Sequence, residues 1–288
     1  MVETPNVRLS LSNSPENVLL VRQALSGVAE AIDIDPLELN DINTAVSEAC
    51  NNVVVHAYGG GEGPLEVDIC ARAPALRVVV RDRGRGIAPA ITAAEGHSAG
   101  DDEQAVGGIG LPVIRALARD AEFKDLAGGG TEVQMEFATA RAGALEHPLP
   151  ADPPQAPAIG QGGLASTVAL TIAPRTLART VLPRLLCALA ARAHFSTDRI
   201  SDTQLLADAL VAQTDGSLSA GHLGVAIGVA PHRLELRIGP LRSGRARALV
   251  LDSSVDGLGP VLERLIDGHE VTADGSSEIL ALHVGADR

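Results

Sequence analysis

Residues 45–58 read Ala-Val-Ser-Glu-Ala-Cys-Asn-Asn-Val-Val-Val-His-Ala-Tyr, and this stretch is the most informative part of the sequence when it is taken with two glycine-bearing segments that follow it. The second segment is Arg81-Asp82-Arg83-Gly84-Arg85-Gly86, and the third is Gly107-Gly108-Ile109-Gly110-Leu111. Each segment alone is a weak signal, because glycine pairs are common and a Glu four residues before an Asn usually lies on a solvated helix face. The order and spacing of the three segments together predict a nucleotide pocket.

The first segment carries a carboxylate and an amide on one predicted helix. Glu48 and Asn52 lie four residues apart within an apolar pattern of helical period, so they share one helix face. An amide oxygen is a hard ligand suited to Mg²⁺, which also takes waters and phosphate oxygens. A carboxylate one turn away can polarise a hydroxyl group or a water near the terminal phosphate. The pair therefore predicts a Mg²⁺ ligand, Asn52, beside a general base, Glu48.

The second segment begins where an alternating strand pattern over residues 76–81 ends. A carboxylate at this point, Asp82, can accept a hydrogen bond from an exocyclic amine such as that of adenine. Gly84 and Gly86 lack side chains, which lets the backbone and a nucleotide approach each other closely. These three residues are predicted nucleotide contacts.

The third segment precedes an apolar stretch with Pro112 near its start, which predicts the first turn of a helix. The bare N–H groups of a helix N-terminus bind phosphate, so Gly108 and Gly110 are predicted to lie against the phosphates. Thr131 follows three consecutive glycines, residues 128–130, and is the last predicted nucleotide contact.

The order Glu-x-x-x-Asn, Asp-x-Gly-x-Gly and Gly-x-Gly resembles the Bergerat (GHKL) ATPase fold of gyrase, histidine kinases and related proteins. Within that group, residues 45–52 followed by His56-Ala57-Tyr58 are similar to the bacterial anti-sigma-factor serine kinases, and the resemblance covers residues 6–138. It implies an α+β fold class, a two-layer sandwich of helices on a mixed, mainly antiparallel sheet.

The resemblance also implies a function. The chain would be an ATP-binding anti-sigma regulatory factor, a protein serine/threonine kinase that sequesters a sigma factor and phosphorylates a serine or threonine on an anti-anti-sigma (STAS) antagonist. In that mechanism Glu48 orients or deprotonates the acceptor hydroxyl, Asn52 binds Mg²⁺ and Asp82 reads adenine. Gly108 and Gly110 cradle the phosphates, and the cofactors are ATP and Mg²⁺.

Two alternative functions stay open: a non-catalytic protein-binding regulator gated by ATP, and a serine kinase in a stress-signalling switch unrelated to sigma factors. The predicted lid over the phosphates, residues 87–106, has four acidic residues and no Lys or Arg. Phosphoryl transfer needs positive charge around the γ-phosphate. Mg²⁺ supplies part of that charge, and Arg83, Arg85 and Arg115 are candidates for the rest.

Composition narrows the class of protein. The chain has 288 residues, 45% of them hydrophobic and only 1% aromatic, so its cores must be built from Leu, Val, Ile and Ala. A net charge of −13 argues against non-specific nucleic-acid binding. The sequence shows no signal peptide and no apolar run long enough to span a membrane, so we expect a cytoplasmic protein. Cys50, Cys70 and Cys187 lack metal-ligand spacing and are interpreted as small apolar residues.

A proline- and glycine-rich segment divides the chain. It predicts a linker over residues 141–165, between an ATP-binding domain over residues 1–140 and a second unit over residues 166–288. Helices are predicted over residues 15–32 and 36–55 of the first unit and over residues 175–194 and 198–213 of the second. The second unit thus repeats the predicted element order of the first at an offset of about 160 residues, which indicates an ancient duplication.

The second unit is predicted to keep the fold and lose the nucleotide site. When Leu39 is aligned with Ile200, Glu48 falls on Ala209 and Asn52 on Gln213. In the strand region, where the two units align at a slightly smaller offset, Asp82 falls on Pro240. A shift of one residue places Asp208 and Ala212 at the first two positions instead. We expect the inactive unit to serve as the partner in a pseudo-dimer within one chain.

Overall fold

The fold comes from a computed structural model, which describes residues 4–86, 110–139, 145, 148–150, 156–159, 164, 166–214, 216–252, 254–255 and 259–286. The first half contains, in chain order, β1 (Val7–Ser12), α1 (Pro15–Ile32), α2 (Pro36–Asn52), the π-helical turn η1 (Val53–Ala57), β2 (Pro64–Arg72), β3 (Ala75–Asp82), α4 (Gly110–Leu117), β4 (Asp120–Asp125) and β5 (Thr131–Ala138). The second half contains β6 (Ser166–Ile172), the 3-10 turn η2 (Arg175–Leu177), α5 (Ala178–Arg192), α6 (Thr197–Gln213), β7 (Leu223–Ala230), β8 (Arg233–Arg242), α7 (Arg245–Leu251), β9 (Ser254–Val255), β10 (Gly259–Pro260), α8 (Leu262–Leu265), β11 (Gly268–Asp274) and β12 (Ser277–Gly285).

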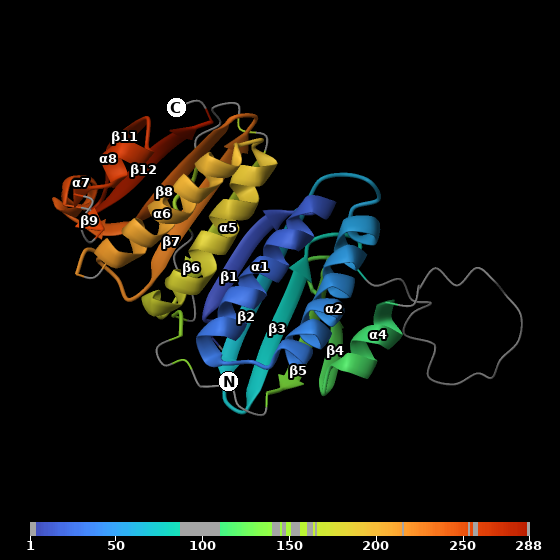
Figure 1. The fold of residues 1–288 in the computed structure, drawn as a ribbon. Coiled ribbons are helices and arrows are strands. Elements are labelled where there is room, and N and C mark those ends of the chain that lie inside the picture. The colour runs from blue at the N-terminus through green and yellow to red at the C-terminus, as the bar shows by residue number, and fades with distance from the viewer. Residues whose placement is uncertain are drawn as a thin grey trace, which may run out of the picture.

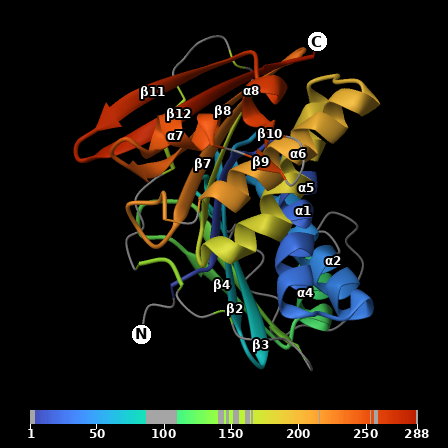
Figure 2. The ribbon, with the colours of Figure 1, turned by 60° about the vertical axis from the view of Figure 1, so that its left-hand side comes forward.

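Within the described residues, ten strands form one continuous sheet in the order β11-β12-β8-β7-β6-β1-β2-β3-β5-β4, and β9 pairs separately with β10. Figures 1 and 2 show α1, α2, α5 and α6 side by side across one face of this sheet. The predicted α+β sandwich of helices on a mainly antiparallel sheet is confirmed. All pairings among the described strands are antiparallel, so the parallel pairs of a mixed sheet are not found within them.

A row of apolar residues crosses all ten strands in register and is centred on the pair Leu9 and Leu170, from β1 and β6. From edge to edge the row is Phe123, Val133, Val80, Val67, Leu9, Leu170, Val225, Ile238, Leu280 and Val271. Leu9 and Leu170 are 161 residues apart, as are Leu39 and Ile200. The register therefore supports the predicted repeat.

Local sequence signals set the ends of the first two helices. Pro15 begins α1, and Asp33 ends it in the left-handed conformation with φ 60°. The Asp35 carboxylate caps α2 by accepting a hydrogen bond from the N–H of Leu37 at 2.8 Å. The helices predicted over residues 15–32 and 36–55 are confirmed, with the difference that the last turn of the second becomes the π-helical turn η1.

The two halves meet along β1 and β6 in the sheet and along α1 and α5 in the helix layer. Gly27 lets the helices approach closely, because a Cβ there would lie 2.7 Å from the carbonyl oxygen of Thr180. Across the same seam, Arg192 donates a hydrogen bond to the side chain of Asn17 at 2.8 Å, and Arg184 pairs with Glu30. The halves thus share one sheet and one helix layer.

The described part of the predicted linker packs on the fold. Leu149 is buried, and its N–H donates to the carbonyl of Pro5 at 2.8 Å. Pro157 lies over Gly224 of β7, 3.3 Å from the position of a Cβ there. At these points the segment between the halves is held against the sheet, so it is more than a free tether.

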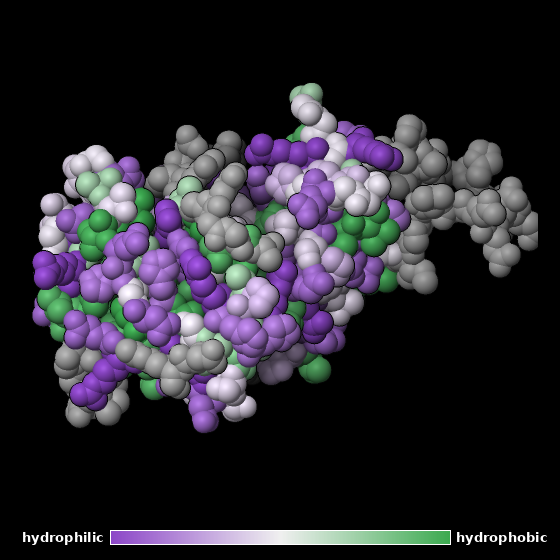
Figure 3. All heavy atoms as spheres, turned by 90° about the horizontal axis from the view of Figure 1, so that it is seen from above, coloured by the Kyte–Doolittle hydropathy of each residue, from purple (hydrophilic) through white to green (hydrophobic). Residues whose placement is uncertain are grey.

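None of the described helices is long and apolar enough to cross a lipid bilayer. Figure 3 shows hydrophilic side chains mixed with small, separate groups of hydrophobic ones. The large hydrophobic side chains that are exposed lie apart on several elements: Leu19, Leu37, Val55, Leu205, Leu251 and Val271. Such scattered exposure is ordinary for a protein surface.

Candidate functional site

The first and third sequence segments meet in space. Glu48 and Asn52 are half-buried on one face of α2, and α4 packs against this helix. A Cβ built on Gly110, the first residue of α4, would lie 3.0 Å from Oε2 of Glu48 and 3.4 Å from Oδ1 of Asn52. A side chain at position 110 would crowd both groups. Glycine therefore keeps the start of α4 open beside a carboxylate and an amide, as a phosphate and metal site requires.

Asp82, at the end of β3, is buried, with 4% of the residue exposed. Its Oδ1 accepts a hydrogen bond from the N–H of Gly84 at 2.7 Å. Burial raises the pKa of the Asp82 carboxyl, although hydrogen bonds from Gly84 and from the backbone and hydroxyl of Thr131 act in the opposite direction. The carboxylate is thus fixed by the protein in one orientation.

Thr131 was predicted to contact the nucleotide, and the structure gives it a contact within the protein. Its backbone N–H and its hydroxyl both hydrogen-bond to the Asp82 carboxylate. Gly130, just before it, has φ +97°, and a Cβ there would lie 2.1 Å from the backbone oxygen of Asp82. The start of β5 therefore supports Asp82 directly.

The two glycines after Asp82 are required by protein packing. A Cβ on Gly84 would lie 2.2 Å from the carbonyl oxygen of Ala57, the last residue of η1. Gly86 has φ +79°, and a Cβ there would lie 2.9 Å from Oδ1 of Asp125 at the end of β4. Both glycines were predicted to allow close approach of a nucleotide, and the contact with Asp125 was missed because no local pattern links β4 to this loop. Close approach to a ligand remains a prediction for Gly84 and Gly86.

Some predicted features lie outside the described residues. Gly108 and the predicted lid over residues 87–106 are among them, so their positions relative to Glu48 are not part of the structure. Within the described ranges there is no cluster of three or more His, Cys, Asp or Glu side chains able to hold a metal ion. A Mg²⁺ ion at Asn52 would thus depend on phosphate oxygens and waters for its other ligands, which is how Mg²⁺ is commonly held.

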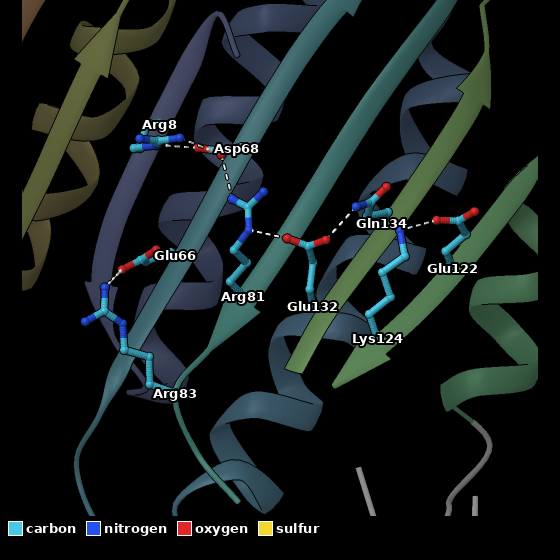
Figure 4. A network of polar contacts seen from close by, with 9 residues as sticks. All are labelled: Arg8, Glu66, Asp68, Arg81, Arg83, Glu122, Lys124, Glu132 and Gln134. Carbon is cyan, nitrogen blue, oxygen red and sulfur yellow. Dashed lines mark hydrogen bonds and ion pairs between the residues drawn. The ribbon is translucent and has the colours of Figure 1, made fainter. Parts of the chain in front are cut away.

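The three arginines considered as phosphate contacts are placed by other groups. The guanidinium group of Arg83 pairs with Glu66 at 3.1 Å (Figure 4). Arg85 lies against Gly59, where a Cβ would be 2.4 Å from its Nη2 atom. Arg115 lies over the ring of Phe123, 5.5 Å from its centroid. Each of the three side chains thus has a contact of its own within the protein.

The sheet face opposite the helices carries a chain of ion pairs that sequence analysis did not single out. Figure 4 shows these side chains in front of the strands, with the helices behind. Asp68 accepts from Arg8 at 2.7 Å and from Arg81 at 2.6 Å, and Arg81 also pairs with Glu132 at 2.5 Å. These charges neutralise one another across β1, β2, β3 and β5. The alternation of charged residues along the strands was the available signal.

The second half differs at the same register. Ile238 occupies the place of Val80 in the row across the sheet, so Pro240 stands where Asp82 stands in the first half. Helix α8 contacts α6 as α4 contacts α2. Ala209 and Leu210 of α6 are buried. The predicted loss of the nucleotide site agrees with these positions and remains a prediction.

Comparisons with known proteins give the family. The profile of the histidine kinase-like ATPase domain matches residues 11–137. The serine-protein kinase RsbW of Bacillus pumilus is 32% identical over 141 residues, which are 45% of this chain and 83% of that protein. RsbW of Listeria monocytogenes is 33% identical over 122 residues, 41% of this chain and 78% of that protein. The anti-sigma F factor of a Thermoanaerobacter species is 27% identical over 135 residues, 47% of this chain and 94% of that protein. The chain therefore belongs to the anti-sigma kinase family of histidine kinase-like (GHKL) ATPases.

Proposed function

We propose that this chain is an ATP-dependent anti-sigma regulator that sequesters a sigma factor and phosphorylates a serine or threonine of a STAS antagonist. The observation that carries the proposal is the meeting of Gly110 with Glu48 and Asn52, because it puts an open helix start beside a candidate base and a candidate metal ligand. The relatives named as a serine-protein kinase and as an anti-sigma F factor support the same function.

Each residue has one role in this proposal. Bound Mg·ATP supplies the phosphoryl group. Asn52 holds the Mg²⁺ ion, and Glu48 orients or deprotonates the acceptor hydroxyl. Asp82 accepts three hydrogen bonds from Gly84 and Thr131, and a carboxylate offers about four acceptor positions. One position is left for the exocyclic amine of adenine.

A second candidate is a non-catalytic regulator in which ATP gates protein binding. It is favoured by the predicted lid over residues 87–106, which has no Lys or Arg, and by the contacts of Arg83, Arg85 and Arg115 with other groups of the protein. A serine kinase in a stress-signalling switch unrelated to sigma factors would use the same site with a different partner. The three functions differ in whether the chain transfers phosphate to a protein and in whether it retains a sigma factor.

The role of the second unit is also a proposal. The units over residues 1–140 and 166–288 form a pseudo-dimer within one chain, and the second unit serves as the dimer partner without binding ATP. The continuous sheet through β1 and β6 and the contact of α1 with α5 support this arrangement. Light scattering is then expected to give the mass of one chain. A stable homodimer with freely tumbling units would contradict it.

The test uses the full chain with Mg·ATP labelled on the γ-phosphate, a STAS-domain protein and a sigma factor from the same genome. We expect calorimetry to give one ATP per chain, acid-stable label on the STAS protein, and retention of the sigma factor on the immobilised chain. The matched control is Glu48→Gln, which should bind ATP and transfer label far more slowly. ATP binding without transfer by the wild-type chain would favour the gated binder, and transfer without sigma retention would favour the unrelated switch. A chain that binds no ATP would contradict the whole proposal.

A further inference from the structure

We propose that the hydroxyl group of Tyr58 positions the loop after β3 and thereby sets the selectivity of the site for its base. The inference rests on the proposed ATP site and adds the group that aligns its base-reading carboxylate. Tyr58 directly follows η1, the turn that continues the helix of Glu48 and Asn52. It therefore lies between the helix that carries Glu48 and Asn52 and the loop that follows Asp82.

The Tyr58 hydroxyl makes two hydrogen bonds. It donates to the carbonyl oxygen of Pro64, at the start of β2, at 2.6 Å, and it accepts the N–H of Arg83 at 2.8 Å. Burial raises the pKa of the Tyr58 phenol, so the hydroxyl keeps its proton and remains able to donate at neutral pH. One oxygen atom thus joins the start of β2 to the loop that follows β3.

Three consecutive backbone N–H groups of that loop each have a fixed acceptor. The N–H of Arg83 donates to the Tyr58 hydroxyl at 2.8 Å, and the N–H of Gly84 donates to the Asp82 carboxylate at 2.7 Å. The N–H of Arg85 donates to the carbonyl of Ala57 at 3.0 Å. Residues 57 and 58 therefore hold the loop on both sides of the amide that orients Asp82.

The packing leaves little freedom for the ring or the loop. A Cβ on Gly63 would lie 2.1 Å from Cε1 of Tyr58, so the ring lies directly on the backbone of residue 63. A Cβ on Gly84 would lie 2.2 Å from the carbonyl oxygen of Ala57. Because neighbouring atoms occupy the space where a side chain of either glycine would lie, packing as well as hydrogen bonds fixes the positions of the Tyr58 ring and the loop.

These contacts predict an effect on the choice of base. A carboxylate that accepts from the amine of adenine discriminates against guanine, which carries a carbonyl group at that ring position. The discrimination depends on holding the Asp82 carboxylate in place, since a mobile acceptor can turn away from the carbonyl group. Loss of the Tyr58 hydroxyl frees the N–H of Arg83 and loosens the loop next to Gly84. Adenine recognition should then weaken more than binding of the shared triphosphate.

The test is calorimetry of Mg·ATP and Mg·GTP binding to the full chain and to Tyr58→Phe, which keeps the ring. We expect the Kd for ATP to rise about tenfold and the preference for ATP over GTP to fall by a similar factor. In the background of Asp82→Asn, the same change should have little further effect, because Tyr58 acts through Asp82. Ser201→Ala, which removes a hydroxyl of α6 in the second half, serves as the control and should leave both Kd values unchanged.

The possible results of these measurements distinguish a failure of the role of Tyr58 from a failure of the proposed ATP site. Unchanged ATP affinity and base preference in Tyr58→Phe would overturn the inference, and so would fully additive effects with Asp82→Asn. If Tyr58→Phe fails to fold, Gly63→Ala gives the second test, because it keeps the hydroxyl and displaces the ring; it should also lower the preference for ATP. A wild-type chain that binds no ATP would instead refute the proposed function, which is a distinguishable result.

Discussion

The two halves of this protein share one register across the sheet and differ in the segments that come after their third strands. In the first half β3 ends at Asp82, and a loop with Gly84 and Gly86 comes next. In the second half β8 continues past Pro240 to Arg242, and helix α7 begins shortly afterwards. The apolar row that organises the sheet is thus independent of the residues that form the site. In the proposed duplication, the second half has lost the site through changes beyond the strand ends and has kept the fold.

The second half also buries apolar side chains on α7 and α8, the two helices that come after its third strand. Leu249 and Val250 of α7 and Leu262 of α8 are each at most 2% exposed. Glu278, at the start of β12, accepts hydrogen bonds from the N–H groups of Gly244 at 2.7 Å and Ala246 at 3.0 Å. The first half instead leaves Glu48 and Asn52 half-buried and polar. The second half thus buries apolar side chains in this region, whereas the first half keeps Glu48 and Asn52, the polar groups of the candidate site.

The largest effect is expected from Asn52→Ala, which removes the candidate Mg²⁺ ligand. Mg²⁺-dependent ATP binding should be abolished, because the ion that neutralises the phosphates is no longer held. Calorimetry with Mg²⁺ and with a chelator measures the difference. The matched change in the other half, Gln213→Ala, should leave ATP binding intact. Equal effects of the two changes would contradict the difference between the halves.

Glu48→Gln should spare ATP binding and lower the rate of phosphate transfer to a STAS protein by about 10²–10⁴-fold, the usual contribution of a general base. Asp208→Asn is the control, since Asp208 takes the place of Glu48 when the alignment of the two halves is shifted by one residue. We expect it to leave the rate unchanged. A normal rate in Glu48→Gln would mean that the carboxylate supports the metal site and is not the base.

Asp82→Asn should weaken ATP binding by roughly 1.5–3 kcal/mol, because it removes a charge-assisted hydrogen bond to the adenine amine. Asp68→Asn is a useful comparison: Asp68 is equally buried but lies among the arginines of the opposite sheet face (Figure 4). That change should reduce stability to urea and leave ATP affinity unchanged. Unaltered affinity in Asp82→Asn would show that another group reads the base.

Local features of the sequence predicted most elements, and contacts distant in sequence were missed. Pro15, Asp35 and Pro36 are local features, and they lie where α1 and α2 begin. The pairing of β1 with β6 was not predicted, because an alternating apolar strand does not specify which strand lies beside it. The contact of Gly84 with Ala57 was missed for the same reason. Spacing brought Glu48 and Asn52 to one face correctly, whereas their approach to Gly110 needed the packing of α4.

The seam between the halves offers a smaller effect. Gly27→Ala should lower the free energy of unfolding by about 2 kcal/mol, since the added Cβ would meet backbone atoms of α5 at 2.7 and 2.8 Å and force the helices apart. Gly221→Ala is the control, because a Cβ there meets no atom within 4 Å. Urea unfolding of both variants measures the difference. Equal stabilities would mean that the two halves do not depend on the contact of α1 with α5.

The smallest expected effect is a change of stability with pH, and it distinguishes the Cys50 thiol of α2 from the Cys187 thiol of α5. Burial raises the pKa of Cys50 to about 12, from an ordinary value of 9.0. Burial also raises the pKa of the half-buried Cys187, but a hydrogen bond with Thr203 acts against it. Between these two pKa values of Cys50, 9.0 and about 12, the folded chain keeps the Cys50 proton, whereas the unfolded chain has released it. The folded state therefore binds more protons, and stability falls as pH rises.

As the pH rises from 8 to 10, titration of the Cys50 thiol should lower the unfolding free energy of the wild-type chain by about 1.4 kcal/mol. Cys50→Ala should lack that part of the loss, although its packing defect lowers stability at both pH values. Cys187→Ala should keep most of it, because a smaller shift contributes less over the same interval. Urea midpoints for the three chains at the two pH values measure these differences, and other titrating groups cancel in the comparison. An identical loss in wild type and in Cys50→Ala would mean that the Cys50 thiol reaches solvent, and that α2 opens more readily than its packing implies.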